Sequence, residues 1–448
     1  MYRDFRWFLD YLEEKGELRR VKKEVDVRFD IAAGIRKSSD VGGPALLFEN
    51  IRGFPGWRVA GGVYSSQKRF ALALGLPMEA DEEAILQRYL ECDQAEVRPR
   101  MVATGPVKEI IIKGDDVDLT QLPVPTYSEL DAGPFLTAGV EFGKHPDTGV
   151  QNVAIHRRQV LDRNHTVILA RGYQQLGMLI TIAEQKGQGL GIATAIGSEP
   201  AVVIASQLVA PFGVDEINMA GAFHRAPIEM VKCETIDVEV PAHAEIVIEG
   251  VTIPNERVVD GPFGEFPGNY ITFLGAPRNE APVMEITAIT MRKNPIFQAV
   301  LTGMPLVQMT ENHLLRKWVV MAAAYREASK IAEVKRVAIT AGGAGMMHAV
   351  IAINKRSDDE PRRVLEALFH PLRATRRIVV VDDDINVSDP VEVEWALATR
   401  VQPHQDIIIR PPEPPYPAKW GIDATMPMRD RQWYQRIKVP GVEKVDYV

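Results

Sequence analysis

The chain has 448 residues, and 52 Lys and Arg against 60 Asp and Glu give it a formal net charge of −8. At roughly 150 residues per domain, this length predicts about three domains or fewer, each able to bury its own core. The negative balance leaves no general basic surface, so we expect no nucleic-acid partner and no membrane partner. The 46% hydrophobic content is that of a globular protein, and no stretch approaches the ~18 consecutive apolar residues of a membrane helix.

The first residues and the cysteines indicate the compartment. Met1 to Phe5 include an early acidic residue and lack the basic-then-apolar order of a signal peptide. Cys92 and Cys233 are the only cysteines in the sequence. We therefore expect a cytoplasmic protein without disulfides.

The first hundred residues predict an α/β unit. Apolar residues at 5, 8, 9 and 12 follow a helical period, so a helix should cover residues 3–15 and end at Gly16. A short strand should follow. Beyond it, helical patterns at 30–37, 67–74 and 81–91 alternate with apolar strands at 45–48 and 58–63. We assign residues 1–105 to this first domain.

The middle of the chain is rich in strands. Prolines between 98 and 135 exclude long helices there and leave a strand only at 109–113. The next strands are expected at 137–142, 152–160, 166–170, 191–196, 229–240, 244–248, 283–291 and 296–300, with helices near 178–186 and 200–209. So many β-branched strands predict a closed or split β-barrel, which we assign to residues 106–305.

The α/β order returns after residue 301. Helices are expected at 311–330, 361–369 and 391–400, and strands at 335–340, 349–354, 378–382 and 406–409. From Pro411 the chain is rich in proline and aromatic residues with no helical period before 429–437, so we expect it to cover a neighbouring surface. Residues 306–448 form the third predicted domain, and the fold class is α/β (α+β).

Common catalytic motifs are absent from the sequence, which has no HExxH, CxxC, GxxxxGK[ST] or GxSxG. The glycines of 187–191 resemble a dinucleotide loop but lack its third glycine and follow a predicted helix. The glycines of 342–345 lie between two predicted strands and indicate a plain turn.

The most informative segment runs from Asp260 to Gly268 and carries two carboxylates, Asp260 and Glu265. Its glycines and prolines exclude a helix and a regular strand, so both acids should stand on a constrained loop, where catalytic groups are often found. Two carboxylates held close together would split their pKa values, so that one stays protonated near neutrality. The alternative interpretation is a surface turn with solvated acids, and spacing alone favours it.

Two further segments carry polar residues at unusual places. Asn152 and Arg157 have opposite parity in the predicted strand 152–160, so they can serve one site only if the strand bulges or turns between them. Otherwise this is a barrel strand with an exposed basic face and His156 is a packed or surface histidine. Glu216 precedes a helix of small residues, where an acid also favours the helix dipole.

Taken together, these segments resemble the UbiD family of prenylated-FMN-dependent, reversible decarboxylases. The matching motifs are Asn152-Val153-Ala154-Ile155-His156-Arg157, residues 233–250, residues 260–268, Val381-Asp382-Asp383-Asp384-Ile385 with residues 395–400, and residues 421–425. Each is weak alone, but five in the family's order are specific. The resemblance implies an N-terminal α/β unit, a central flavin-binding split β-barrel and a C-terminal α/β oligomerisation domain.

The resemblance also implies catalytic roles. An arginine and two carboxylates form the family's acid–base triad, and Arg157, Asp260 and Glu265 occupy these positions, with Asp260 where many members have Glu. Glu265 would reprotonate the carbon after CO₂ leaves, while Arg157 positions the substrate carboxylate and Asp260 keeps the network charged and ordered. Decarboxylation of a conjugated acid needs an electron sink, which the prenylated flavin would supply.

The implied cofactor site combines flavin and metal ligands. Asn152, the residue aligned at 175 and Glu216 would hold a divalent ion that bridges to the flavin phosphate. Most members place a His after Gln at position 175, whereas this chain has Gln174-Gln175, so its oxygen ligands suit Mg²⁺ or Mn²⁺. Carbonyls of Ala205, Ser206 and Leu208 would hold a monovalent cation such as K⁺, and Arg376 would meet the phosphate. The implied flavin contacts are residues 152–157, Gln174, Gln175, Glu216 and Arg376.

The substrate and the partners stay open at this stage. An α,β-unsaturated or (hetero)aromatic acid should bind against residues 301–309 and the loop after Asp260, either by dipolar cycloaddition or, for electron-rich acids, as a carbon nucleophile. A phosphorylated unsaturated acid would require further basic groups. A flavin prenyltransferase would supply the cofactor, and a homodimer or larger homo-oligomer is expected. The competing hypotheses are a metal-dependent hydrolase that uses Asp260, Glu265 and Glu216, and a non-catalytic flavin-binding subunit.

Overall fold

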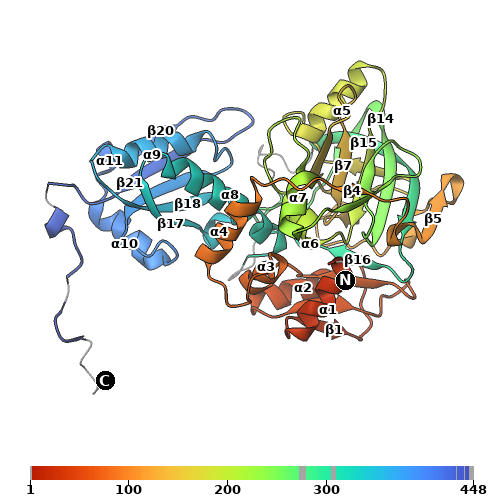
Figure 1. The fold of residues 1–448 in the computed structure, drawn as a ribbon, viewed down its shortest axis with the longest axis horizontal. Coiled ribbons are helices and arrows are strands. Elements are labelled where there is room, and N and C mark those ends of the chain that lie inside the picture. The colour runs from red at the N-terminus through yellow and green to blue at the C-terminus, as the bar shows by residue number, and fades with distance from the viewer. Residues whose placement is uncertain (1–2, 272–278, 304–308, 430, 438, 443–448) are drawn as a thin grey trace. The chain divides into compact units, whose positions relative to one another are not determined.

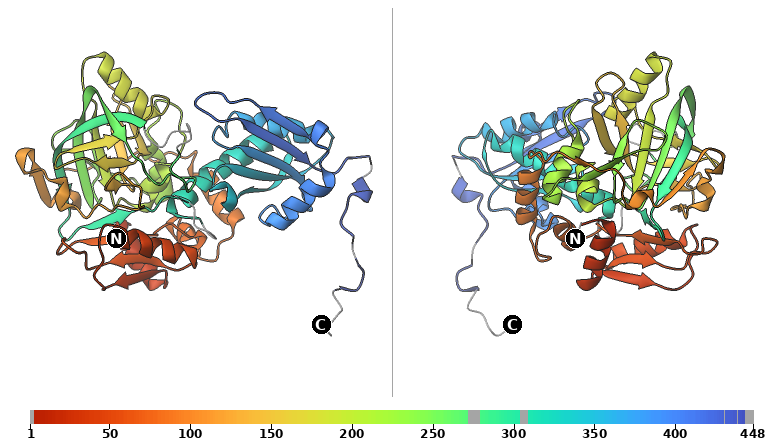
Figure 2. Two further views of the ribbon diagram at one scale, coloured as in Figure 1. Left: turned by 180° about the vertical axis from the view of Figure 1, so that it is seen from behind. Right: turned by 45° about the vertical axis from the view of Figure 1, so that its right-hand side comes forward.

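The computed structural model describes residues 3–271, 279–303, 309–429, 431–437 and 439–442. The chain divides into two compact units, Met1–Val319 and Val320–Val448. Figure 1 and Figure 2 show the elements of each unit. Among the described residues, no helix combines the length and the apolar character needed to cross a membrane.

The N-terminal elements form a small α/β layer. Helix α1 begins after Asp4, whose carboxylate accepts a hydrogen bond from the Trp7 N–H at 2.8 Å, and its predicted apolar stripe is buried. Strand β16, distant in sequence, pairs in parallel with β3 and completes the four-stranded order β1-β2-β3-β16. The elements are α1 (Phe5–Glu14), β1 (Leu18–Val21), α2 (Asp30–Asp40), β2 (Ala45–Phe48), β3 (Arg58–Gly61), α3 (Gln67–Ala73), α4 (Glu82–Cys92) and β16 (Ile296–Ala299).

The central sheet is a split barrel. Its described strands follow the order β6-β9-β10-β15-β14-β11-β7-β8, with β5 added beside β15. The bounds are β5 (Ile110–Lys113), β6 (Phe135–Leu136), β7 (Val140–Lys144), β8 (Gln151–Ile155), β9 (Arg158–Val160), β10 (His165–Ile168), β11 (Gly191–Ile196), β14 (Ile246–Asp260) and β15 (Asn279–Met291). Because β8 lies at one end of this path and β9 near the other, the chain crosses the split at residues 156–157.

Helices and a small sheet surround the barrel. Helix α5 lies on the side of the barrel away from the N-terminal layer in all three views (Figures 1 and 2). One hydrophobic core joins the barrel to that layer and contains, for example, Ile35, Phe48, Ile248 and Ile286. The surrounding elements are α5 (Gln175–Gln185), α6 (Pro200–Ala205), α7 (Glu216–His224), β4 (Arg100–Met101), β12 (Glu229–Lys232) and β13 (Glu239–Pro241).

The second unit is an α/β sheet in the order β17-β18-β19-β21-β20, in which β18, β19 and β21 run parallel. Helix α8 begins in the first unit and ends in the second. The elements are α8 (Glu311–Ser329), β17 (Glu333–Ile339), β18 (His348–Asn354), α9 (Glu360–Phe369), β19 (Arg377–Asp382), α10 (Pro390–Arg400), α11 (Pro403–Asp406), β20 (Ile407–Arg410) and β21 (Lys419–Ala424).

Three predictions of secondary structure away from the site are wrong. The single strand expected at 229–240 is the hairpin β12–β13, because buried Glu249 accepts N–H groups of Glu234 and Thr235 at 2.8 Å and holds the turn. The segment after Pro411 is not only a covering tail, since it supplies β21. The helix expected at 429–437 is reduced, within the described residues, to one 3₁₀ turn at Arg431–Trp433.

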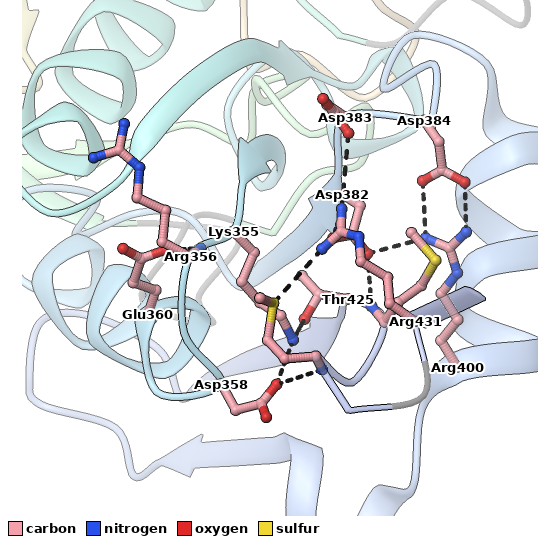
Figure 3. Close-up of polar contacts among 12 residues, drawn as sticks. Lys355, Arg356, Asp358, Glu360, Asp382, Asp383, Asp384, Arg400, Thr425 and Arg431 are labelled. Atoms are coloured by element: carbon pink, nitrogen blue, oxygen red, sulfur yellow. Dashed lines mark hydrogen bonds and ion pairs between the residues drawn. The ribbon is translucent and has the colours of Figure 1, made fainter. Parts of the chain in front are cut away.

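Two of the five sequence motifs meet at the carboxyl ends of the parallel strands in the second unit (Figure 3). Arg400 is fully buried and contacts Asp384 through Nη2 at 2.6 Å and Asp382 through Nη1 at 3.3 Å. Arg431 also approaches Asp382, at 3.0 Å. On the neighbouring strand ends, the Lys355 ammonium donates to Thr425 at 3.0 Å. The motifs at 381–385, 395–400 and 421–425 therefore form one largely buried polar network.

Loss of the buried Arg400 should destabilise the protein more than loss of the exposed Arg410. Arg400→Met leaves the buried Asp382 and its neighbour Asp384 short of a cation and should destabilise the second unit by about 3 kcal/mol. Arg410→Met removes an exposed ion pair with Glu366 and should cost less than about 1 kcal/mol. Chemical denaturation of the full chain checks this, and equal losses in the two variants would contradict it.

Candidate active site

The predicted strand 152–160 is interrupted between Asn152 and Arg157, as it must be if both residues serve one site. Strand β8 ends at Ile155 and β9 begins at Arg158, so His156 and Arg157 lie in the crossing between them. The Leu169 N–H donates to the Arg157 carbonyl at 3.2 Å, and the His156 Nδ1 atom lies 3.0 Å from the Leu169 carbonyl. Burial lowers the pKa of His156 to about 4, so this residue is a neutral packed histidine.

Arg157 bridges the two carboxylates of the acidic segment. Its Nη2 donates to Asp260 and its Nη1 donates to Glu265. The exposed fractions of the three side chains are 8% for Arg157, 0% for Asp260 and 14% for Glu265. Burial acts to lower the pKa of Arg157, but the two carboxylates outweigh it and raise that pKa. The interpretation of this segment as a solvated surface turn is wrong.

Two aromatic rings flank the Arg157 guanidinium. Its carbon lies 4.7 Å from the centroid of Phe263 and 5.8 Å from that of Phe135, and the two rings are 4.5 Å apart. Neither ring was predicted to belong to the site. The place of Phe263 inside the acidic segment could have indicated that its ring belongs to the site. Phe135 comes from the short strand β6, and nothing in the sequence around it points to the site.

Asp260 lies in a strand, and Glu265 lies in the loop that follows it. Asp260 is the last residue of β14 and pairs with Asn279 of β15, so the prediction that it lies on a loop is wrong. Glu265 does lie on the loop. This loop is fixed by hydrogen bonds from the Gly264 N–H to Asp131 at 2.8 Å and from the Thr302 hydroxyl to the Gly264 carbonyl at 2.5 Å.

Burial dominates the electrostatics of Glu265. It raises the pKa of this carboxyl, and the charge of Arg157 only partly opposes the rise. Arg171 acts on Glu265 in the same direction as Arg157. The Nη1 atom of Arg171 is buried without a hydrogen-bond partner among the described residues, and this cation was not among the predicted site residues.

The three expected divalent ligands also meet. The Asn152 amide nitrogen lies 3.2 Å from Gln175 Oε1 and 3.3 Å from Glu216 Oε1, while the Val153 N–H donates to Glu216 Oε2 at 2.9 Å. Asn152 lies in β8, and Gln175 and Glu216 are the first residues of α5 and α7. Gln175 is oriented by its amide, which donates to the Ala210 carbonyl at 2.7 Å. Burial raises the pKa of Glu216 to about 8, as expected for a carboxylate placed where a cation would compensate it.

This cluster fits a hard divalent cation. The Asn152 Oδ1 atom is buried and has no hydrogen-bond partner in the part of the chain that the structure describes. In this structure the Asn152 amide nitrogen faces the oxygens of Gln175 and Glu216. Turning the amide over would place Oδ1 beside them and give an all-oxygen set, which suits Mg²⁺ or Mn²⁺. Two of these three groups are amides, and within the described ranges no three His, Cys, Asp or Glu side chains gather as metal ligands.

The remaining predicted residues lie as follows. Ala205 ends α6, and its carbonyl accepts the Leu208 N–H at 2.9 Å, while the Ser206 hydroxyl donates to Val203. Gln174 precedes α5 and accepts the Arg171 N–H at 2.8 Å. Arg376 is an exposed residue of the second unit, directly before β19. Of the expected pocket segment 301–309, residues 304–308 are outside the described residues.

The fold and site define a class of protein. A split barrel holds a buried arginine with two carboxylates, one of them with a raised pKa, and an oxygen-lined cation cluster begins five residues before that arginine. This arrangement is suited to acid–base chemistry on an anionic substrate, with a place for a cation nearby.

Three protein-family models match the chain in succession. Residues 9–90 match the 3-octaprenyl-4-hydroxybenzoate carboxy-lyase N-terminal domain, residues 100–305 its Rift-related domain and residues 313–418 its C-terminal domain. The chain therefore belongs to the UbiD family of prenylated-FMN-dependent carboxy-lyases.

Solved structures and curated relatives agree with this membership. The chain is 39% identical to an evolved dimeric form of the UbiD-class enzyme HmfF from Pelotomaculum thermopropionicum in complex with prFMN, over 99% of both chains at a TM-score of 0.88. It is 30% identical to the vanillic acid decarboxylase of Sedimentibacter hydroxybenzoicus in closed form, over 99% of this chain and 97% of that one at a TM-score of 0.85. It is also 31% identical to the anhydromevalonate phosphate decarboxylase of Methanosarcina mazei, over 98% of this chain and 99% of the relative.

Proposed function

We propose that this carboxy-lyase reversibly decarboxylates an α,β-unsaturated or (hetero)aromatic acid without net oxidation, and that Arg157, Asp260 and Glu265 are its catalytic residues. The observation that carries the proposal is the buried bridge of Arg157 between the two carboxylates. Such a bridge holds a cation ready for an anionic substrate and an acid ready for a carbon that needs a proton.

Arg157 binds and orients the substrate carboxylate. Its Nη1 and Nη2 atoms are engaged by Glu265 and Asp260, while its Nε is buried without a hydrogen-bond partner among the described residues. A guanidinium has five N–H donors, so Arg157 keeps hydrogens beyond these two contacts for a substrate carboxylate. The rings of Phe263 and Phe135 fix the plane of the guanidinium and keep water from its face.

Glu265 holds the proton that replaces CO₂. Its raised pKa keeps a larger fraction of the carboxyl protonated near neutrality than an exposed glutamate would have. Prenylated FMN, when bound, supplies the electron sink for the electrons of the broken C–C bond. Glu265 then donates its proton to the substrate carbon. Arg157, held by Asp260, stabilises the Glu265 carboxylate that this transfer leaves.

For the cofactor we propose the ligands that the oxygen cluster supports. Asn152, Gln175 and Glu216 would hold a divalent ion, Mg²⁺ or Mn²⁺, and carbonyls of Ala205, Ser206 and Leu208 would hold K⁺. Residues 152–157, Gln174 and Arg376 would bind the flavin. We further propose a cytoplasmic homo-oligomer that receives its cofactor from a flavin prenyltransferase.

The contacts disfavour the two competing functions. A hydrolase with one ion shared by all three acids would need Glu216 beside Asp260 and Glu265, whereas Glu216 contacts Asn152 and Val153 and the other two contact Arg157. A carrier subunit would need only phosphate ligands, and the buried acid–base set would then serve no purpose.

Removal of the acid should stop turnover and spare the flavin. Glu265→Gln keeps a hydrogen-bonding group for Arg157 but has no proton to transfer, so the rate should fall by at least about 100-fold. The measurement compares decarboxylation with the visible absorbance of protein coexpressed with a flavin prenyltransferase. Glu256→Gln, on an exposed stretch of β14, is the matched control. Loss of flavin from Glu265→Gln would show that the residue is structural.

The pH dependence of kcat should show a raised acid. Since burial raises the pKa of Glu265, the protonated form needed for turnover is retained to a higher pH and is lost as pH rises through that raised value. We expect kcat to decline on the alkaline side, with an inflection above the ordinary value of about 4.3. A kcat that rises steadily with pH through neutrality would contradict this role.

The cation cluster makes a prediction about metal retention. Gln175→His places an imidazole nitrogen at the first residue of α5 and should increase the divalent metal that survives gel filtration. Elemental analysis of the eluted protein measures it. Gln185→His, at the exposed other end of the same helix, is the control. A fall in occupancy for Gln175→His would remove residue 175 from the ligand set.

A further inference from the structure

A buried histidine outside the acid–base set contacts the loop that carries Glu265. His313 lies in the first turn of α8 and is 0% exposed. Its Nε2 atom is 2.6 Å from the carbonyl oxygen of Phe266, the residue directly after Glu265. The imidazole also meets the Phe266 ring edge-on, with 4.5 Å between centroids.

The partners of His313 determine its tautomer. A carbonyl oxygen only accepts, so Nε2 carries the hydrogen and donates it to Phe266. Nδ1 is then the acceptor, and it lies 3.3 Å from the Thr310 N–H and 3.0 Å from the Thr310 hydroxyl. Burial lowers the pKa of His313 to about 4, so the ring is neutral and this polarity persists near neutral pH.

The helix that presents His313 is itself held firmly. Glu311, two residues before His313, is 1% exposed. Its carboxylate accepts hydrogen bonds from the N–H groups of Gly62 at 2.7 Å and Tyr64 at 3.1 Å. The first turn of α8 is thus joined to the chain after β3. His313 therefore projects from a fixed support.

Glu265 lies in a small turn, and the carbonyl that His313 binds belongs to Phe266 of the same turn. The Glu265 N–H donates to the Asn269 carbonyl at 2.8 Å, and the Gly268 N–H donates to the Glu265 carbonyl at 2.9 Å. These bonds close the turn on itself, and the contacts of Gly264 with Asp131 and Thr302 hold it on the side before Glu265. The bond from His313 ties the turn to α8 directly beside the acid.

We propose that His313 is a positioning residue, which holds the turn of Glu265 so that its carboxyl reaches the substrate carbon for proton transfer. This inference rests on the proposed function, because it assigns a role to His313 only if Glu265 is the acid. A misplacement of about 1 Å at a reacting group can cost on the order of 100-fold in rate, so one hydrogen bond at this place can matter.

Two variants separate the two ring nitrogens. Glutamine places its amide nitrogen where Nε2 lies, whereas asparagine reaches only the position of Nδ1. His313→Asn should lower kcat by roughly 10- to 100-fold with little change in KM, and should raise the solvent deuterium isotope effect on kcat because proton transfer has become slow. His313→Gln should restore kcat to within a few-fold of the wild type. Holoenzyme with unchanged flavin absorbance is used throughout.

The results decide the inference in either direction. Full activity of His313→Asn, or equal losses in both variants, would overturn it. If His313→Asn does not fold, ¹⁵N spectra of histidine-labelled wild-type holoenzyme, with the signal assigned from His313→Gln, provide the second test. We expect a neutral ring protonated on Nε2, and an Nδ1-protonated or charged ring near neutral pH would overturn the contact. A wild-type holoenzyme that decarboxylates no acid would instead end the proposed function, while the spectra still judge the contact.

Discussion

The site depends on one constraint, the burial of the Arg157 guanidinium. A buried cation is tolerated only when anions and hydrogen bonds compensate its lost hydration. Here Asp260 and Glu265 provide the compensation from the end of β14 and from the following loop. The arginine in turn keeps two carboxylates close together away from water. Removal of any one member leaves charge without a partner, so the three side chains act as a unit.

The crossing at residues 156–157 allows this arrangement. In an unbroken strand Asn152 and Arg157 would point to opposite faces, and one segment could not serve both clusters. The interruption between β8 and β9 lets Asn152 join Gln175 and Glu216 while Arg157 reaches the acids. Five residues of extended chain span at most ~17 Å, so the two clusters lie within reach of a single bound molecule.

Local sequence predicted much of this, and tertiary contacts account for the rest. The buried stripe of α1 and the need for a break before Arg157 followed from periodicity and parity. Strand β21 was missed because its sequence has little β character, and it fits where Gly421 leaves room for Leu365 and Phe369 of α9. Phe263 could be noted for its place in the acidic segment. Phe135 and His313, in contrast, meet Arg157 and Phe266 from distant parts of the chain, so no local pattern could have revealed their roles.

The central claim is that this buried set transfers a proton to the carbon that loses CO₂. The most direct measurement incubates the flavin-loaded enzyme in D₂O with a panel of α,β-unsaturated and aromatic acids and follows deuterium at that carbon by NMR. Our account predicts that at least one acid yields CO₂ and a product with one deuterium where the carboxylate was attached. Flavin-loaded, folded enzyme that produces no such labelled product from any acid, while it hydrolyses substrates in a metal-dependent way, would contradict it.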